Sequence, residues 1–184
     1  MLRKTFLYLA LATLTQCSKC KDDPRPRDPA AALPPATQTG ANTFGCLVNG
    51  QPYTPGGYNG TPNYAVLYDP GFQGGNLQVT SYRYPEKGGA KQQGVSFGGI
   101  NIDHVGNYQL GAIYGTGASF FDEYRTAPCD EYRSRNTGVY TKGTLTITRL
   151  DLQVSIIAGT FEFTLAKLGC DTVKVTQGRF DKKL

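Results

Sequence analysis

Three segments near the C-terminus alternate apolar and polar side chains with a period of two. Residues 143–150 place Leu145 and Ile147 on one side of the chain and threonines on the other, and residues 160–165 and 172–176 repeat this pattern with phenylalanine and valine. Successive side chains of a β-strand point to opposite faces, so each segment is predicted to be a strand with one dry face. A dry face must be covered by a second layer.

The three segments are predicted to form an antiparallel meander, joined by turns around Asp151 and Gly169. A second sheet covering the meander makes an antiparallel β-sandwich the expected fold, with a closed β-barrel as the alternative. No stretch of the chain has a helical period, so we expect an all-β protein with at most one short helix. The 23 Gly, the 12 Tyr and the 18% charged residues agree with a turn-rich sheet.

Two further strand signals precede the meander. Asn49-Gly50 separates the apolar runs 44–48 and 51–53, and this dipeptide supplies the positive φ angles that a two-residue hairpin requires. Residues 77–82 alternate with period two, which predicts another strand.

A change of parity lies between Phe97 and Ile102. Val95 and Phe97 share one face of a predicted strand, whereas Ile100 and Ile102 fall on the opposite parity. The glycines at 98–99 are therefore predicted to form a β-bulge that returns the later residues to the inward face.

The first 16 residues have the character of a signal peptide. Arg3 and Lys4 precede an apolar run over residues 5–14, which is shorter than the roughly 20 residues that span a bilayer. Leu14-Thr15-Gln16-Cys17 resembles the lipobox of bacterial lipoproteins, although Gln16 departs from the small residue usual there. The resemblance implies lipidation at Cys17 and attachment to a membrane. Two alternatives stay open, namely cleavage after Ala12 in an A-x-A site and acylation at Cys20.

Residues 17–41 are predicted to be a proline-rich tether, because their prolines interrupt both helix and sheet. As polyproline II, about 20 residues would reach about 60 Å. The remaining residues, 42–184, are expected to form one β-domain.

Four stretches of that domain carry a resemblance to a known group of proteins. They read FGCLVNGQPYTP (44–55), GTLTITRLD (143–151), AGTFEFTL (158–165) and TVKVTQGRFD (172–181), and they resemble a family of uncharacterised Bacteroidota lipoproteins. The resemblance implies a β fold and an exported, outer-membrane-anchored protein that faces the periplasm or the cell surface. It implies no activity. Lys21-Asp22-Asp23 resembles a surface-export signal and equally fits a solvated linker.

The five cysteines set a disulfide expectation. With Cys17 acylated, four cysteines remain, and these allow three connectivities. An exported protein meets oxidising conditions, and we expect a bond between Cys129 and Cys170. Closing this loop of about 40 residues would stabilise the fold by about 4 kcal/mol in the chain-entropy model. Cys46 is expected to be a buried free thiol rather than a partner of Cys20.

Signals of catalysis are weak. The single histidine, His104, lies in a turn with no partner at metal-ligand spacing, and a solvated turn residue is the favoured interpretation. Residues 115–120 begin like a dinucleotide-binding loop but lack its third glycine, so we interpret them as a turn. Asp122-Glu123 and Asp130-Glu131 fit a solvated loop better than a calcium site. We therefore expect no enzyme, no metal and no cofactor.

The charge of the domain excludes one class of partner. Beyond residue 41 the basic and acidic residues are nearly equal in number and form no basic stripe, so the sequence does not predict binding to the phosphates of a nucleic acid.

Tyrosines suggest a binding role. Tyr58, Tyr64, Tyr82 and Tyr84 lie among glycine, asparagine and proline, and their rings suit a glycan or a protein partner. The competing interpretation is that these rings wedge loops against the sheet. The leading hypothesis is a non-catalytic, envelope-anchored module that binds a glycan, a peptide or another envelope protein. A structural surface module and a carboxylate-based glycan hydrolase are the alternatives.

Overall fold

The computed structural model describes residues 28–111 and 115–184. The predicted signal peptide, Cys17 and Cys20 lie outside the described residues.

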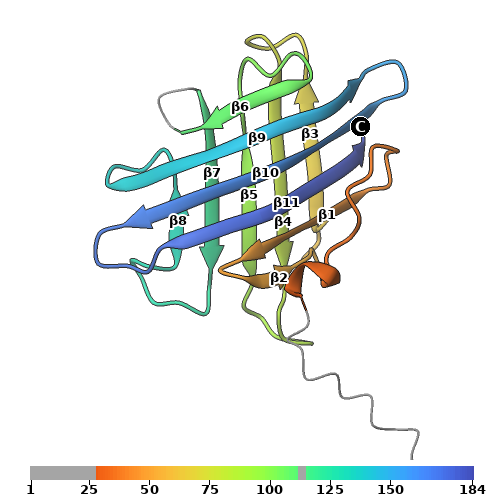
Figure 1. Ribbon diagram of the computed structural model, residues 1–184. Coiled ribbons are helices and arrows are strands. Elements are labelled where there is room, and N and C mark those ends of the chain that lie inside the picture. Colours follow the sequence, from red (N-terminus) through yellow and green to blue (C-terminus); the bar gives the residue numbers. More distant parts are fainter. Residues whose placement is uncertain (1–27, 112–114) are drawn as a thin grey trace, which may run out of the picture.

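Two antiparallel sheets pack face to face as a sandwich, and their strands cross at a wide angle (Figure 1). The six-stranded sheet has the order β2 (Gln51–Tyr53), β1 (Thr43–Val48), β11 (Val173–Lys183), β10 (Ile156–Lys167), β9 (Val139–Asp151), β6 (Gly106–Leu110). The five-stranded sheet has the order β3 (Tyr64–Asp69), β4 (Asn76–Arg83), β5 (Gln93–Gly99), β7 (Thr116–Asp122), β8 (Glu131–Arg133). The predicted β-sandwich is confirmed, and the barrel alternative is not adopted. In the described residues one short 3-10 helix, η2 (Pro29–Ala32), is the only helix.

The predicted meander is confirmed in β9, β10 and β11, which pair antiparallel over most of their lengths. Leu145, Ile147, Phe163 and Val175 are all buried, as their parity requires. Burying a side chain of this size contributes about 1.5–3 kcal/mol, so the inward row is a principal source of stability. Aromatic rings join the two layers of the core. Phe97 of β5 lies against Phe161 of β10 with 4.2 Å between ring centroids.

The predicted hairpin near the start is also confirmed. β1 pairs with β2 across Asn49 and Gly50, whose φ angles are 49° and 78°. Both central residues of the turn thus have positive φ, as a two-residue hairpin of this kind needs.

The predicted bulge at Gly98 and Gly99 is wrong. β5 keeps an unbroken register with both β4 and β7 through Gly99, where the strand ends. Asn101, with a φ of 59°, then turns the chain, and Ile102 reaches the core from the following loop. The change of parity marked the end of a strand rather than an extra residue inside it.

Part of the predicted tether packs on the domain. Residues 33–41, here called the strap, lie against the six-stranded sheet, where they contact β1, β11 and β9. Leu33 is buried, and a side chain on Gly45 would meet the ring of Pro34 at 2.6 Å. The described part of the tether therefore lies against the domain instead of extending away from it.

One carboxylate fastens the strap to β11. Asp181 has no exposed surface, and its oxygens accept hydrogen bonds from Thr37 Oγ1 (2.7 Å) and from the amides of Thr39 (2.9 Å), Gly40 (2.8 Å) and Ala41 (3.1 Å). Burial raises the pKa of Asp181, but the donated hydrogen bonds outweigh it and hold that pKa below its ordinary value. The charged form is thus the form that holds the strap.

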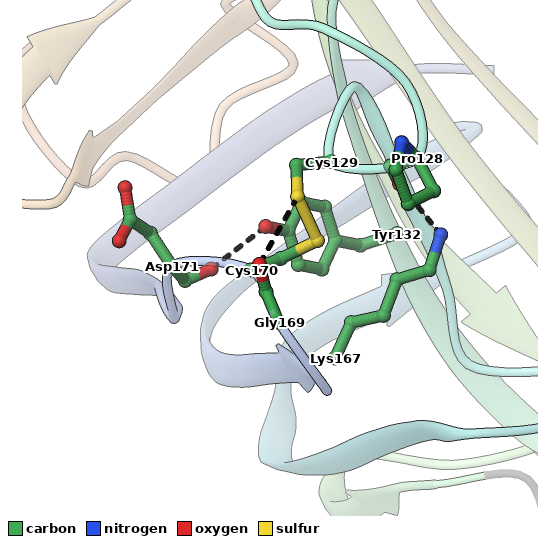
Figure 2. Close-up of a disulfide and its surroundings, with 7 residues drawn as sticks. All are labelled: Pro128, Cys129, Tyr132, Lys167, Gly169, Cys170 and Asp171. Carbon is green, nitrogen blue, oxygen red and sulfur yellow. Dashed lines mark hydrogen bonds between the residues drawn. A yellow bond between two sulfur atoms is a disulfide. The ribbon is translucent and has the colours of Figure 1, made fainter.

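The predicted disulfide is present and joins the two sheets (Figure 2). Cys129 lies in the loop between β7 and β8, and Cys170 lies in the turn between β10 and β11, with 5.4 Å between their Cα atoms. Two hydrogen bonds run alongside it. Tyr132 donates from its hydroxyl to the carbonyl of Asp171 (2.7 Å), and Lys167 donates to the carbonyl of Pro128 (2.6 Å). This end of the sandwich is therefore closed covalently and by hydrogen bonds.

Candidate functional site

A polar hollow of about 410 Å³ lies on the outer face of the five-stranded sheet, over β4, β5, β7 and β8. Its floor is formed where Gly98 of β5 pairs directly with Gly117 of β7, so that neither strand places a side chain there. The next cross-strand pair on the same face is Ser96 with Ser119, which are also small. We call this depression the sheet hollow.

A side chain on either glycine of the floor would collide with a neighbouring group. Gly98 has a φ of +146°, and a Cβ there would lie 2.0 Å from the carbonyl oxygen of Leu77. A Cβ on Gly117 would lie 2.2 Å from the hydroxyl of Ser134. The close approach of neighbouring groups thus keeps the floor bare.

Arginines and amides surround the floor. Arg133 and Arg135 line one side, and Asn76 and Gln78 line another. Arg133 is paired with Glu131, whereas Arg135 is exposed and makes no ion pair with any described residue.

The chain after β8 is attached to β7 through Ser134. Ser134 is buried, and its Oγ accepts a hydrogen bond from the amide of Ala118 (3.2 Å), while its own amide donates to the Ala118 carbonyl (3.0 Å). Ser134 lies between Arg133 and Arg135 in the chain, so this contact fixes the backbone that carries both arginines. The hollow therefore combines a floor of small residues with two arginines at its margin, of which Arg133 is held by its ion pair with Glu131.

The chemistry of this lining suits a polar ligand that carries oxygen acceptors. Guanidinium groups bind carboxylates through two parallel hydrogen bonds, and serine hydroxyls and amides serve as both donors and acceptors. The lining residues include no carboxyl group and no histidine, so the hollow supplies no acid or base of its own.

The tyrosines proposed from the sequence do not form one surface. Tyr58 is 76% exposed and Tyr84 is half-buried, whereas Tyr64 and Tyr82 are buried. Tyr82 donates its hydroxyl to the carbonyl of Thr61 and so holds the loop between β2 and β3. Tyr64 lies inside the sandwich, where burial raises the pKa of its hydroxyl. The wedge interpretation thus describes Tyr82, whereas Tyr64 is a core residue of β3.

The other candidate groups lie apart from the hollow. His104 is exposed in a turn, and its Nδ1 lies 2.5 Å from the carboxylate of Asp103, a contact that lowers the pKa of that carboxyl. Asp122 forms an ion pair with Arg125, and the carboxylate of Glu123 accepts a hydrogen bond from the backbone amide of Gln92. Across residues 28–111 and 115–184, no three His, Cys, Asp or Glu side chains gather as a metal site would require.

Sequence reasoning missed the hollow because it misread part of its floor. Residues 115–120 were interpreted as a turn, but Thr116 begins strand β7. Glycine is uncommon inside strands, and here it is used because a neighbour approaches closely. The signal available in the sequence was the pair of glycine–serine stretches at 94–98 and 115–119, which becomes informative only once the two strands are known to pair.

The chain matches no protein-family model, no curated protein and no solved structure. None of the helices in the described part of the chain is long and apolar enough to cross a membrane.

Proposed function

We propose that this chain is a non-catalytic binding protein of the bacterial cell envelope, attached to the outer membrane by lipid at Cys17. The sheet hollow is its ligand site, and a glycan that carries carboxylate groups is its ligand. The sheet hollow is the observation that carries the proposal. Its volume lies within the range of about 300–1,000 Å³ typical of small-molecule sites.

An acidic sugar fits the lining better than a neutral one does. The free guanidinium of Arg135 offers a carboxylate two hydrogen bonds, and Ser96 and Ser119 lie on the floor within the same depression to meet ring hydroxyls. A glycan hydrolase would need two carboxyl groups facing the scissile bond. The lining provides none, so binding without cleavage is the proposed role.

The experiment is a glycan array of acidic and neutral oligosaccharides, followed by titration calorimetry with the best acidic binder. We expect Arg135→Ala to abolish most of the binding. Lys174→Ala is the matched control, because Lys174 is also an exposed cation but lies on β11 in the other sheet. Equal loss of binding in both variants would show only a general charge effect.

A second pair of variants tests the hollow by filling it. Ser96→Tyr places a ring over the floor, and we expect it to block binding while the fold is kept, because residue 96 faces outward. Thr164→Tyr adds the same ring to the outer face of the other sheet and serves as the control. An acidic glycan that binds Ser96→Tyr as well as it binds the wild type rules out the hollow as its site.

A further inference from the structure

The outer edge of β3 differs from the other three sheet edges. β2 and β8 are only three residues long, and β2 contains Pro52. On β6 the hydroxyl of Thr116 donates to the carbonyl of Gln109, which occupies that acceptor. β3 is six residues long, has no proline, and has no charge before Asp69. Natural proteins usually protect such an edge, and here no such protection is built into the strand.

The hydrogen-bonding parity of β3 follows from its pairing with β4. The amide of Tyr82 donates to the carbonyl of Asn63, so the Asn63 carbonyl faces β4. In an antiparallel pair the bonding residues alternate, and the backbone groups of Tyr64, Val66 and Tyr68 therefore point away from β4. No strand of the described chain pairs with that edge, which Figure 1 shows as the outer margin of the five-stranded layer.

An apolar groove of about 470 Å³ begins where this edge begins. Its lining includes Leu33 and Pro34 of the strap, Pro55 of the loop between β2 and β3, and Asn63 and Tyr64 where β3 begins. Tyr64 belongs to both features, so the groove continues the free edge. A peptide that paired with β3 would therefore reach the groove at the Tyr64 end of the strand.

Charges at the two ends of β3 have opposite sign. The Lys182 ammonium lies 4.9 Å from the centroid of the Tyr64 ring, at the groove end. Asp69 lies at the far end of the strand. An antiparallel chain would meet Asp69 first and Lys182 last, so it would be complemented by a basic residue early and an acidic residue late.

We propose that the β3 edge and the adjoining groove bind an extended peptide segment of a partner protein by strand addition. The segment pairs antiparallel with β3, places an apolar side chain in the groove, and carries a basic residue before its strand and an acidic residue after it. Main-chain hydrogen bonds to Tyr64, Val66 and Tyr68 hold the peptide, and the groove selects its side chain. This surface is distinct from the sheet hollow and does not depend on the proposed glycan.

The test uses the full-length protein and the fluorescent peptide Lys-Val-Thr-Val-Thr-Leu-Glu, with anisotropy as the readout. A second peptide carries N-methyl groups at its two valines, which removes the amide hydrogens that face Val66 and Tyr68. We expect the first peptide to bind at least about tenfold more tightly than the second, a difference of about 1.4 kcal/mol. Equal binding of the two peptides, or no binding of either, overturns the proposal.

Variants of the protein test the two halves of the surface separately. Val66→Pro removes the edge amide, and Val66→Ala removes the same side chain while keeping the amide. We expect only the proline variant to lose binding, with circular dichroism showing that both are folded. Should Val66→Pro not fold, the methylated peptide still decides the question of pairing.

Thr54→Trp tests the groove, because Thr54 is an exposed residue of its lining. We expect this variant to weaken binding, whereas Lys142→Trp, at an exposed position of β9 outside the groove lining, leaves it unchanged. Binding that is unaffected by Thr54→Trp overturns the role of the groove.

Discussion

Replacing Asp181 by asparagine removes the charge that holds the strap. In the native protein one oxygen accepts from Thr37, Thr39 and Ala41, and the other accepts from Gly40. Asparagine keeps only one acceptor oxygen. Its NH2 group takes the place of the other oxygen and would face a donor of the strap, so neither of these two donors would have an acceptor. The remaining bonds lose their charge assistance, which contributes about 1 kcal/mol each, and an unsatisfied buried N–H costs about 1–3 kcal/mol. If the strap detaches, water can solvate these groups, and this limits the cost. We therefore expect the free energy of unfolding to fall by about 2–4 kcal/mol.

Urea unfolding measures this loss, and hydrogen exchange locates it. We expect the amides of Thr39, Gly40 and Ala41 to lose protection in Asp181→Asn while the amides of β9 and β10 keep theirs. Asp171→Asn is the matched control, since Asp171 is exposed in the turn before β11. If the two variants had the same stability and the same exchange at residues 39–41, the argument that the buried carboxylate fastens the strap would be refuted.

Four further predictions concern pH and the cysteines. The pKa of Asp181 is lower in the folded protein than in the unfolded chain, so its contribution to stability is present above the unfolded-state pKa and is lost as the pH falls through the folded-state pKa. Hydrogen-exchange protection of the strap amides should therefore decline below about pH 4 in the native protein, and Asp181→Asn should not show this decline. Replacing both Cys129 and Cys170 by serine should lower the free energy of unfolding by about 4 kcal/mol, measured in urea, and a loss below about 1 kcal/mol would contradict the loop-closure account. Burial raises the pKa of the Cys46 thiol to about 12, so iodoacetamide at neutral pH should label it only after unfolding, and rapid native labelling would disprove that burial. Cys17→Ser should move the protein from the membrane fraction to the soluble fraction, and unchanged retention would reject acylation there.

Local alternation of side chains was sufficient to predict the strands of the C-terminal meander. Ile147 and Phe163 face the core because period-two patterning is a property of the chain itself and needs no partner to be recognised. Asn49-Gly50 predicted its hairpin for the same reason, since its φ preferences are local. The disulfide partners were also within reach, because few cysteines remained and two of them lay in turns of the predicted sheet.

Features that depend on which strands are neighbours could not be read in this way. The sheet hollow exists because Gly98 meets Gly117, two residues that are separated in the sequence by β6 of the other sheet and close only through the pairing of β5 with β7. Asp181 likewise binds a strap that lies more than a hundred residues earlier, which made a proline-rich segment part of the domain. The amino-acid sequence by itself determined strand identity and inward faces, since these follow from adjacent residues. The register between distant strands, and with it the hollow, the strap and the free edge of β3, was decided only by the packing of the two sheets.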